Sequence, residues 1–392
     1  MKMLRLAPVV LSAVALPLAW GVYAPIPEQE QGKAFVVTLR AGLSHDSNIF
    51  GAATGAIDST VYSFAPSLKF NSSVTDQTFV SASYRLTLDN FEDRPGDKTL
   101  DSHNLDLRVA HAFSQTANID LSNAYTVAKN PESLLAGIPL NTDQSYKRNQ
   151  FDGQLTGNLT ERTSLTGKAR FTNYDYDDAT LGASIDRNEN LIGLAATHTL
   201  LPELKLNAEV RRQEVDYRTG GATKDKESNF LIGGFDYSVA RKFTASGRLG
   251  YEWRQRSGAP DEDAPYIEVS GKYDYAERSY LTGGFVHTLE EASDVARFTD
   301  TRVNRFFVNL QHSLSPLFVL SGSLTYEPST LQGRGLQADI DERTTRFGLG
   351  LTYLPNRHWS ISGTFDSDRV SSDLASREMS RRRYGVNAAF SF

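Results

Sequence analysis

Strict alternation of apolar and polar residues is the dominant pattern of this chain after residue 30. The segment FVVTLRAGL places Phe35, Val37 and Leu39 on one face and Thr38 and Arg40 on the other. The same pattern recurs in many segments, among them 79–88, 243–253, 317–326 and 346–353. A period of two with one clean apolar face predicts β-strands, and helical periodicity is almost absent.

The links between these segments alternate in length. Short links are found at 71–76, 114–118, 160–163, 201–203, 240–242, 276–279, 315–316 and 355–358. Longer links, rich in Asp, Gly, Pro and Ser, fall between them at 45–59, 89–99, 129–144, 177–187, 218–226, 257–265, 291–301, 328–341 and 369–378. They divide the chain into about 18 strands, an even number. The pattern predicts an all-β fold, a transmembrane antiparallel up-and-down β-barrel with both ends on the short-turn side.

The contents of the two faces favour a membrane barrel over a soluble sandwich. The segments run ten residues or more, enough to cross a bilayer when tilted, whereas sandwich strands usually have about five or six. Charged residues in mid-strand indicate a wet lumen. Aromatic residues gather beside the short links, as in an interfacial girdle: Phe70, Phe113, Phe243, Tyr275, Tyr280, Phe318, Tyr353, Trp359, Phe390 and Phe392. A looser set lies near the long links: Tyr62, Tyr176, Tyr217, Trp253, Tyr266 and Tyr326.

The first residues have the layout of a secretory signal peptide. Lys2 and Arg5 precede an apolar run that ends in small residues, with cleavage expected after Gly21 or Ala24. The alternative, an N-terminal membrane anchor, is disfavoured because two prolines interrupt a run that is short for a span. We therefore expect a signal peptide over 1–24, a short periplasmic segment over 25–33 and an outer-membrane barrel over 34–392, with both termini periplasmic.

The last nine residues, YGVNAAFSF, read as a strand whose outward side must face lipid. We expect this strand to close against the first, because an open edge in hydrocarbon leaves backbone groups unpaired. The ending is similar to the terminal signal that the barrel-assembly machinery reads in outer-membrane proteins. The residues of that signal here are Tyr384, Val386, Ala388, Phe390 and Phe392.

The first hairpin, residues 39–70, contains a loop Asp-Ser-Asn-Ile-Phe followed by a strand with a Pro-x-Leu segment. It resembles the opening of the EpsL-type proteins, outer-membrane β-barrel porins encoded with exopolysaccharide operons. The matching positions are Asp46, Asn48, Ile49, Phe50, Pro66 and Leu68, while Ser47 departs from the pattern. The resemblance implies an outer-membrane component of exopolysaccharide biosynthesis or export, with the secreted polysaccharide and its export proteins as partners. It implies a pathway but no mechanism.

Composition narrows the function further. The net charge of −6 gives no basic bias for a nucleic-acid partner, and the absence of cysteine excludes disulfides, thiolate catalysis and cysteine zinc sites. The sequence contains no known catalytic motif, and its seven histidines are scattered without metal spacing. We therefore expect a non-enzymatic protein without metal or cofactor. A barrel-embedded hydrolase stays open as an alternative, since distant strands could assemble Asp, Ser and His.

Three charged clusters have two interpretations each. The acidic residues Asp175, Asp177 and Asp178, like those at 261–263, could bind Ca²⁺ or lie in solvated loops. The run Arg381 to Arg383 is expected where the last strand leaves the outer surface. There its guanidinium groups could pair with lipopolysaccharide phosphates or be merely solvated.

The alternation also predicts which charged residues line the lumen. The inward basic residues are Arg40, Lys69, Arg85, Arg108, Lys168, Arg170, Arg211, Arg248, Arg305 and Arg346, with Asp106, Glu209, Glu252 and Glu268 on the same wall. They could form a basic path for an anionic sugar chain, or a self-neutralising lattice of ion pairs that fills the barrel. The function classes that follow are a porin-like exopolysaccharide component, a general diffusion porin for small solutes, and a lumen-plugged docking barrel.

Overall fold

The computed structural model describes residues 34–129, 145–239, 242–292 and 294–392. The described residues form eighteen strands and three short helical segments. The strands are β1 (Phe35–Asp46), β2 (Ser59–Thr75), β3 (Thr78–Phe91), β4 (Thr99–Ala112), β5 (Ala117–Ala128), β6 (Tyr146–Asn158), β7 (Thr163–Tyr176), β8 (Arg187–Leu201), β9 (Leu204–Tyr217), β10 (Lys226–Val239), β11 (Phe243–Arg256), β12 (Glu262–Ala276), β13 (Ser279–Glu291), β14 (Phe298–Ser315), β15 (Phe318–Gly333), β16 (Ile340–Tyr353), β17 (Trp359–Ser372) and β18 (Met379–Ser391). The helical segments are α1 (Ala179–Ile185), α2 (Gly221–Lys224) and η1 (Ala375–Arg377).

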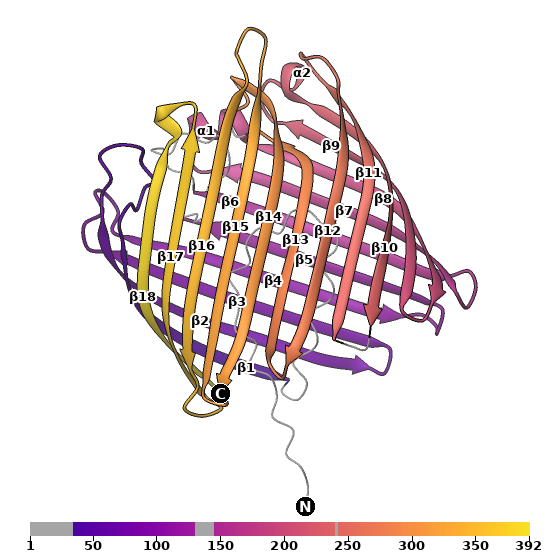
Figure 1. The fold of residues 1–392 in the computed structure, drawn as a ribbon, viewed down its shortest axis with the longest axis horizontal. Helices are drawn as coiled ribbons and strands as arrows, with labels where there is room; N and C mark the ends of the chain where they lie inside the picture. The colour runs from indigo at the N-terminus through magenta and orange to yellow at the C-terminus, as the bar shows by residue number, and fades with distance from the viewer. Residues whose placement is uncertain (1–33, 130–144, 240–241, 293) are drawn as a thin grey trace, which may run out of the picture.

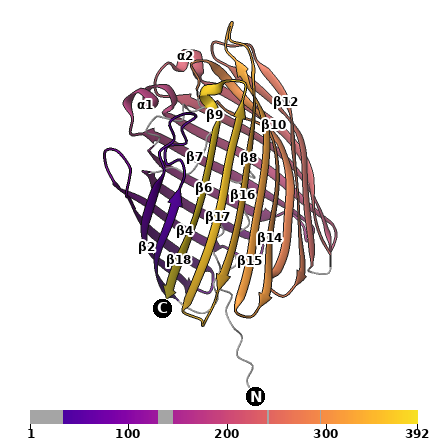
Figure 2. The ribbon, with the colours of Figure 1, turned by 60° about the vertical axis from the view of Figure 1, so that its left-hand side comes forward.

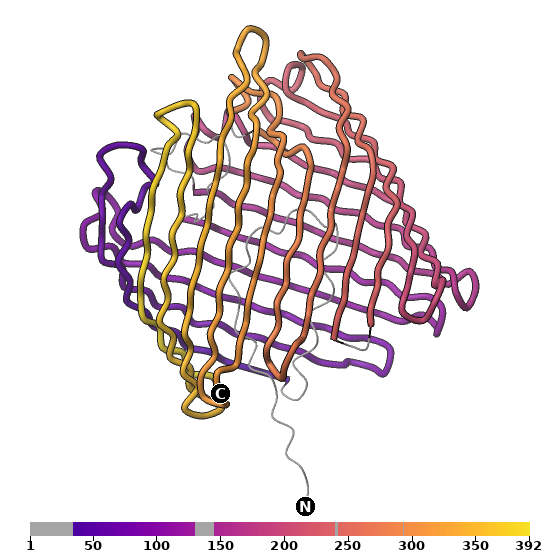
Figure 3. The backbone as a smooth tube through the Cα atoms, in the orientation of Figure 1, coloured from indigo at the N-terminus to yellow at the C-terminus, as the bar shows by residue number. Residues whose placement is uncertain are grey.

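Each strand pairs antiparallel with its sequence neighbours, and β1 pairs with β18 to close the ring. The closing register runs from Thr38 opposite Ser391 to Asp46 opposite Arg383. Figure 1 and the tube in Figure 3 show the tilted strands of one continuous wall, and the turned view in Figure 2 shows the β17, β18 and β2 side of the ring. Closure leaves no sheet edge, which hydrocarbon requires. The predicted transmembrane up-and-down barrel of 18 strands is confirmed.

Large apolar side chains cover the outer surface of the wall. Leu249 is 65% exposed, Val386 58% and Ile192 55%, while the residues on either side of each point into the barrel. A monomeric soluble protein rarely exposes a continuous apolar band of this kind, so the band is the lipid-facing surface. Among the described residues, no helix has the length and apolar character needed to span a membrane.

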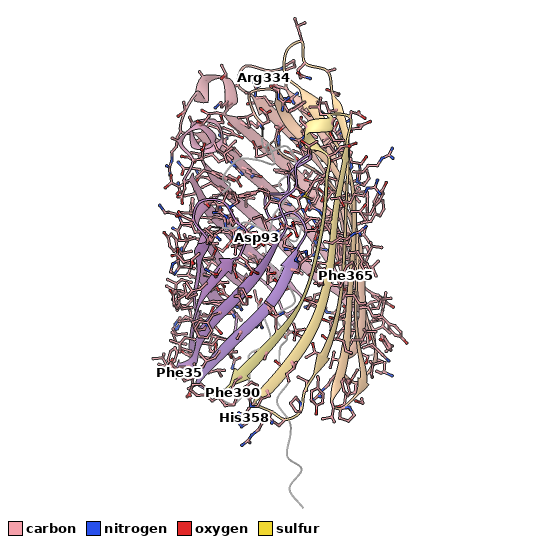
Figure 4. The ribbon with its side chains drawn as sticks, turned by 90° about the vertical axis from the view of Figure 1, so that its left-hand side faces the viewer. Phe35, Asp93, Arg334, His358, Phe365 and Phe390 are labelled. Carbon is pink, nitrogen blue, oxygen red and sulfur yellow. The ribbon has the colours of Figure 1, made fainter. Side chains whose placement is uncertain are left out.

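The two ends of the barrel differ in their connections. The short-turn end has links as brief as 202–203 and 277–278, while the long-loop end has links such as 47–58 together with α1, α2 and η1. Figure 4 places Phe35, His358 and Phe390 at the short-turn end and Arg334 at the long-loop end. The predicted alternation of link lengths is therefore present. The predicted signal peptide, the segment 25–33 and most of the link 129–144 lie outside the described residues.

One part of the predicted aromatic girdle is wrong. Tyr176, Tyr217 and Tyr266 lie on the inner face and are 6%, 6% and 5% exposed. Their strand positions share the parity of inward residues, so they pack inside the long-loop end instead of facing lipid. Tyr280 likewise alternates with the exposed Leu281 and faces inward. The other residues of the looser set, Tyr62, Trp253 and Tyr326, are exposed on the outer surface.

Candidate functional site: the lumen wall and its mouth

The basic residues predicted for the lumen lie on the inner face of the wall. Arg211 follows the exposed Val210, Arg248 precedes the exposed Leu249, and Arg305 precedes the exposed Phe306. Successive residues of a strand point to opposite faces, so each of these arginines points inward. The same parity holds for the other predicted positions: Arg40, Lys69, Arg85, Arg108, Lys168, Arg170 and Arg346.

Most of these cations are held by carboxylates on neighbouring strands. Arg108 donates two hydrogen bonds to Asp120, at 2.9 and 2.6 Å, and Arg248 donates two to Asp236, at 2.8 and 3.0 Å. Further pairs join Lys168 to Glu209, Arg170 to Asp152, and Arg305 to both Glu290 and Glu327. Charged side chains in a polar wall keep their ionised forms when paired in this way. The result is a lattice that is hydrophilic but close to neutral.

Arg211 of β9 is stabilised by aromatic rings as well as by charge. Its guanidinium carbon lies 4.9 Å from the ring centre of Phe230 and 5.3 Å from that of Tyr266, and its Nε lies 3.4 Å from Glu209. Cations over aromatic faces gain about 0.5–2 kcal/mol, more when they are desolvated. The inward-facing rings of Phe230 and Tyr266 therefore stabilise Arg211, which the ion-pair lattice contacts only through Glu209.

Arg40 and Arg85 form the exception to the lattice. In the register of β1, β2 and β3, Arg40 lies opposite Ala65 and Arg85 opposite Ser67, two residues further along β2. Within the described part of the chain, neither guanidinium forms an ion pair or a side-chain hydrogen bond. Lys69 follows on the same inner face of β2. The wall of β1 to β3 thus carries two guanidinium groups without a carboxylate partner, and we call Arg40 and Arg85 the basic patch.

A buried charge cluster lies where the lumen meets the long-loop end. At its centre is Asp300 of β14, whose side chain is fully buried. It accepts hydrogen bonds from Lys226 at 2.9 Å, from Arg256 at 2.8 Å and from Arg254. Glu291 of β13 accepts from Lys226 at 2.7 Å and from Arg254 at 3.2 Å. We call Lys226, Arg254, Arg256, Glu291 and Asp300 the mouth cluster.

The mouth cluster ties the end of the β13–β14 hairpin to β10 and β11. The β14–β15 register shifts between Phe298 and Thr301, as expected for a bulge. By alternation from the exposed Phe306, Asp300 belongs to the outward set, yet it contacts the inward Lys226 and Arg254. The Tyr217 hydroxyl of β9 adds a hydrogen bond of 2.7 Å to Glu291. The end of the β13–β14 hairpin therefore leans over the lumen. It is held by β11 and β10, which lie three and four strands from β14 around the ring.

Contacts between the links of the long-loop end narrow its opening further. Val295, 1% exposed, packs in one apolar cluster with Tyr174, Tyr176, Leu181, Ile185, Val215 and Tyr217. Arg334 donates to the carbonyls of Val295 at 3.1 Å and of Thr223 in α2 at 2.7 Å. Lys224 of α2 donates to the Ser184 carbonyl of α1 at 3.1 Å. Burial and the nearby Arg334 charge lower the pKa of Lys224. These contacts narrow the long-loop opening above β7 to β15.

Sequence reasoning did not find the mouth cluster as a unit. Arg254 and Arg256 share the inward parity of Arg248, so the alternation contained a signal for them. No such signal exists for Asp300, because alternation assigns it to the outer face and its partners are separated from it by 44 residues or more in the chain.

The family-motif residues build the seam where the ring closes. Asp46 accepts bidentate hydrogen bonds from Arg381 of β18, and both side chains are buried. The Asn48 side chain donates to the carbonyls of Ala52 and Ser380 and accepts from the Ala52 amide, at 2.8, 3.2 and 2.8 Å. One carboxylate and one amide thus join β1, its loop and β18, which gives these motif positions a structural role.

The remaining motif residues lie either in a buried cluster inside the barrel or on its lipid-facing surface. Ile49 is buried with Val61 and Phe91, and Phe50 packs against this group. Pro66 and Leu68 lie on the outer face of β2, where Leu68 is 39% exposed.

The residues of the expected assembly signal lie on the outer face of β18 and just beyond it. Tyr384, Val386 and Phe392 are more than half exposed, and Phe390 contacts the rings of Trp359 and Phe392 at 5.0 and 5.8 Å. Ala388 is on the same face, opposite Ala41 of β1. Recognition by the assembly machinery stays a prediction.

The structure separates the three arginines that sequence placed together at the outer surface. Arg381 and Arg383 face the lumen side, where they pair with Asp46 and Asp368. Alternation leaves only Arg382 of the three on the outer face, so the two interpretations given for the run, phosphate pairing or solvation, apply to Arg382 alone.

Carboxylates of the two acidic clusters form ion pairs and hydrogen bonds with other groups of the protein. Asp175 pairs with Arg218, Asp178 caps α1 through the Leu181 amide, and a hydrogen bond from Lys129 lowers the pKa of Asp177. Glu262 faces inward and accepts from Arg302 and from Gln332. Across the described ranges, no group of three or more His, Asp and Glu side chains is placed to hold a metal ion.

Comparison with known proteins finds likeness at the level of fold. No protein-family model and no curated protein matches the sequence. The structure is similar to the outer membrane protein OpdK from Pseudomonas aeruginosa, with 10% identity, a TM-score of 0.50 and coverage of 91% of this chain and 98% of OpdK. It is also similar to OccAB2 from Acinetobacter baumannii, with 11% identity, a TM-score of 0.50 and coverage of 91% and 97%. The chain therefore shares the barrel fold of these two outer-membrane proteins.

Proposed function

We propose that this protein is an outer-membrane channel through which small polar solutes diffuse, with a preference for anions. Its long-loop end faces the exterior and its short-turn end the periplasm. Barrels of 16–18 strands leave room for an aqueous channel, and the inner wall is polar and charged on strand after strand. The outer-membrane location is supported by the fold shared with OpdK. The proposed activity is passage without chemistry, so no catalytic residue is assigned.

The basic patch is the observation that supports anion preference. Paired charges in the lattice attract and repel a passing ion about equally, so they contribute little net selectivity. Arg40 and Arg85 have no such counter-charge among the described residues, and they therefore set the sign of the field along the wall of β1 to β3. The mouth cluster narrows the opening but is internally compensated, so we assign it to restriction by size.

Reversing the charge of the basic patch is expected to reverse the selectivity. In planar phospholipid bilayers under a KCl gradient, the wild-type reversal potential should report chloride preference. The double variant Arg40→Glu/Arg85→Glu should shift the chloride-to-potassium permeability ratio toward potassium by about fivefold, the factor that corresponds to ~1 kcal/mol of Coulomb energy in a wet lumen. Arg343→Glu, on the outer face, is the matched control and should leave the ratio unchanged. Cation preference in the wild type, or no conductance at all, would contradict the proposal.

A second candidate function is a role in exopolysaccharide production or export. It is supported by the EpsL-like motif of the first hairpin and by a lumen whose unpaired charges suit an anionic sugar chain. The motif residues at the seam contribute to closure of the barrel. The motif alone therefore supports a role in the exopolysaccharide pathway less directly than it supports a channel. Deleting the gene in a polymer-secreting host should reduce secreted polysaccharide, and the wild-type gene should restore it. Normal secretion by the deletion strain would leave the diffusion channel as the remaining proposal.

A further inference from the structure

Three arginines line up on the outer face of β16, β17 and β18. Arg343, Arg369 and Arg382 are all exposed and share the parity of the lipid-facing residues of their strands. Arg343 lies opposite Ser371, two residues from Arg369, while Arg369 lies opposite Ser380, two residues from Arg382. Diagonal neighbours of this kind have side chains about 7–8 Å apart. We call these residues the arginine row.

The arginine row differs from the outward Arg212 in having no partner. Arg212 pairs with Glu214 and Glu227. In the ranges that the structure describes, Arg343, Arg369 and Arg382 form no ion pair and no side-chain hydrogen bond. Asp341, the nearest outward carboxylate along β16, instead accepts a hydrogen bond of 2.7 Å from Thr330. Three uncompensated cations on a lipid-facing surface therefore lack an anion.

Directly below the row, the outer surface is hollowed. A groove of about 770 Å³ crosses β15 to β18 and continues over β1 and β2. Its lining is almost entirely apolar and includes Leu43, Leu349, Leu351, Phe365, Tyr384 and Val386. Gly363 of β17 belongs to this lining, and a Cβ added there would meet no atom within 4 Å. On each strand the row lies on the long-loop side of these apolar residues: Arg382 precedes Tyr384, and Arg369 follows Phe365.

We propose that the arginine row and the groove form a binding site for lipopolysaccharide. The guanidinium groups bind the phosphates of its lipid A, and an acyl chain lies in the groove. This inference rests on the outer-membrane placement proposed above, with the long-loop end outward, but not on conduction. Arginine suits phosphate because its planar fork donates two parallel hydrogen bonds. A row that spans three strands fits a headgroup with two separated phosphates better than a phospholipid with one.

Lipid binding by purified protein in detergent tests the site. The probes are bisphosphorylated lipid A and phosphatidylglycerol, and the readout is the apparent dissociation constant for each. The variant R343Q/R369Q/R382Q is expected to bind lipid A about tenfold more weakly, the sum of three exposed charge contacts. Its charge-matched control is R162Q/R278Q/R357Q, which removes three exposed arginines from the short-turn end and should bind lipid A like the wild type.

A second variant separates the groove from the row. Gly363→Leu adds a large apolar side chain to the lining at a position where its Cβ meets no atom within 4 Å, and it should weaken lipid A binding severalfold although all three arginines remain. Both variants should keep the heat-dependent gel migration of a folded barrel and the wild-type conductance in phospholipid bilayers, which contain no lipid A. Unchanged lipid A affinity in the row variant would overturn the site, and an equal loss of phosphatidylglycerol binding would overturn its assignment to lipopolysaccharide. Neither outcome would affect the proposed channel.

Discussion

Replacing Asp300 with alanine is expected to lower the free energy of unfolding of the barrel by about 3–5 kcal/mol. The substitution leaves Lys226, Arg254 and Arg256 crowded in a buried site whose central carboxylate has gone. Removing one member of a buried ion cluster costs more than the pair contributed, because the remaining charges stay desolvated. Glu291 can neutralise only part of this excess. Urea titration in detergent micelles, followed by tryptophan fluorescence, measures the change.

The same variant should loosen the long-loop opening. Once Asp300 no longer anchors the β13–β14 hairpin, Arg297 should become accessible to trypsin and the single-channel conductance should rise. Asp93→Ala is the control, since Asp93 is an exposed carboxylate in another long link, and it should change neither stability nor conductance. Wild-type stability and conductance in the Asp300 variant would show that the cluster does not hold the hairpin.

Replacing Asp46 with alanine should have an effect of similar size at the seam. Its hydrogen bonds from Arg381 join the first strand to the last, and both side chains are buried. The variant leaves the Arg381 guanidinium buried and unpaired, which is expected to cost about 3–5 kcal/mol. The measurement is again urea unfolding, with heat-dependent gel migration to show at which temperature the ring opens.

A double variant tests whether the lost stability comes from the orphaned charge. Asp46→Leu/Arg381→Met replaces the pair with apolar side chains of similar volume, a change that is often neutral or stabilising for buried ion pairs. Its stability should therefore exceed that of Asp46→Ala. If the two variants were equally unstable, the seam would depend on the hydrogen bonds themselves and not on charge balance. Asp368→Ala, which removes one partner of the half-buried Arg383 next to the seam, should cost less.

Much of this fold could be predicted from alternation alone. Long strands with a period of two leave only one way to shield the backbone in hydrocarbon, so strand number and closure followed from the pattern of links. The inward position of Arg108, Arg248 and Arg305 followed from the same parity. Their partners could not be predicted with equal ease, because the register between strands decides which carboxylate lies opposite each cation.

The wrong predictions concern residues whose inward or outward side was not taken from the alternation or does not follow it. Tyr176, Tyr217 and Tyr266 were assigned to the membrane interface from their place near strand ends, although their parity put them inside. The run Arg381 to Arg383 read as one basic cluster, yet a strand divides neighbours between two faces. Asp300 contacts inward residues although alternation assigns it to the outer face. Contacts between links, such as Arg334 with α2, have no periodic signature in the sequence at all.

The isolation of Arg40 and Arg85 has a consequence for the salt concentrations at which the proposed channel would select ions by charge. The field of unpaired charges decays over about 30 Å in 10 mM salt but over only about 3 Å in 1 M salt. In fresh water, the basic patch would act across much of the pore and sort passing ions by sign. In brine, the same two side chains would influence only ions that come into close contact with them. The barrel would then select solutes by size alone.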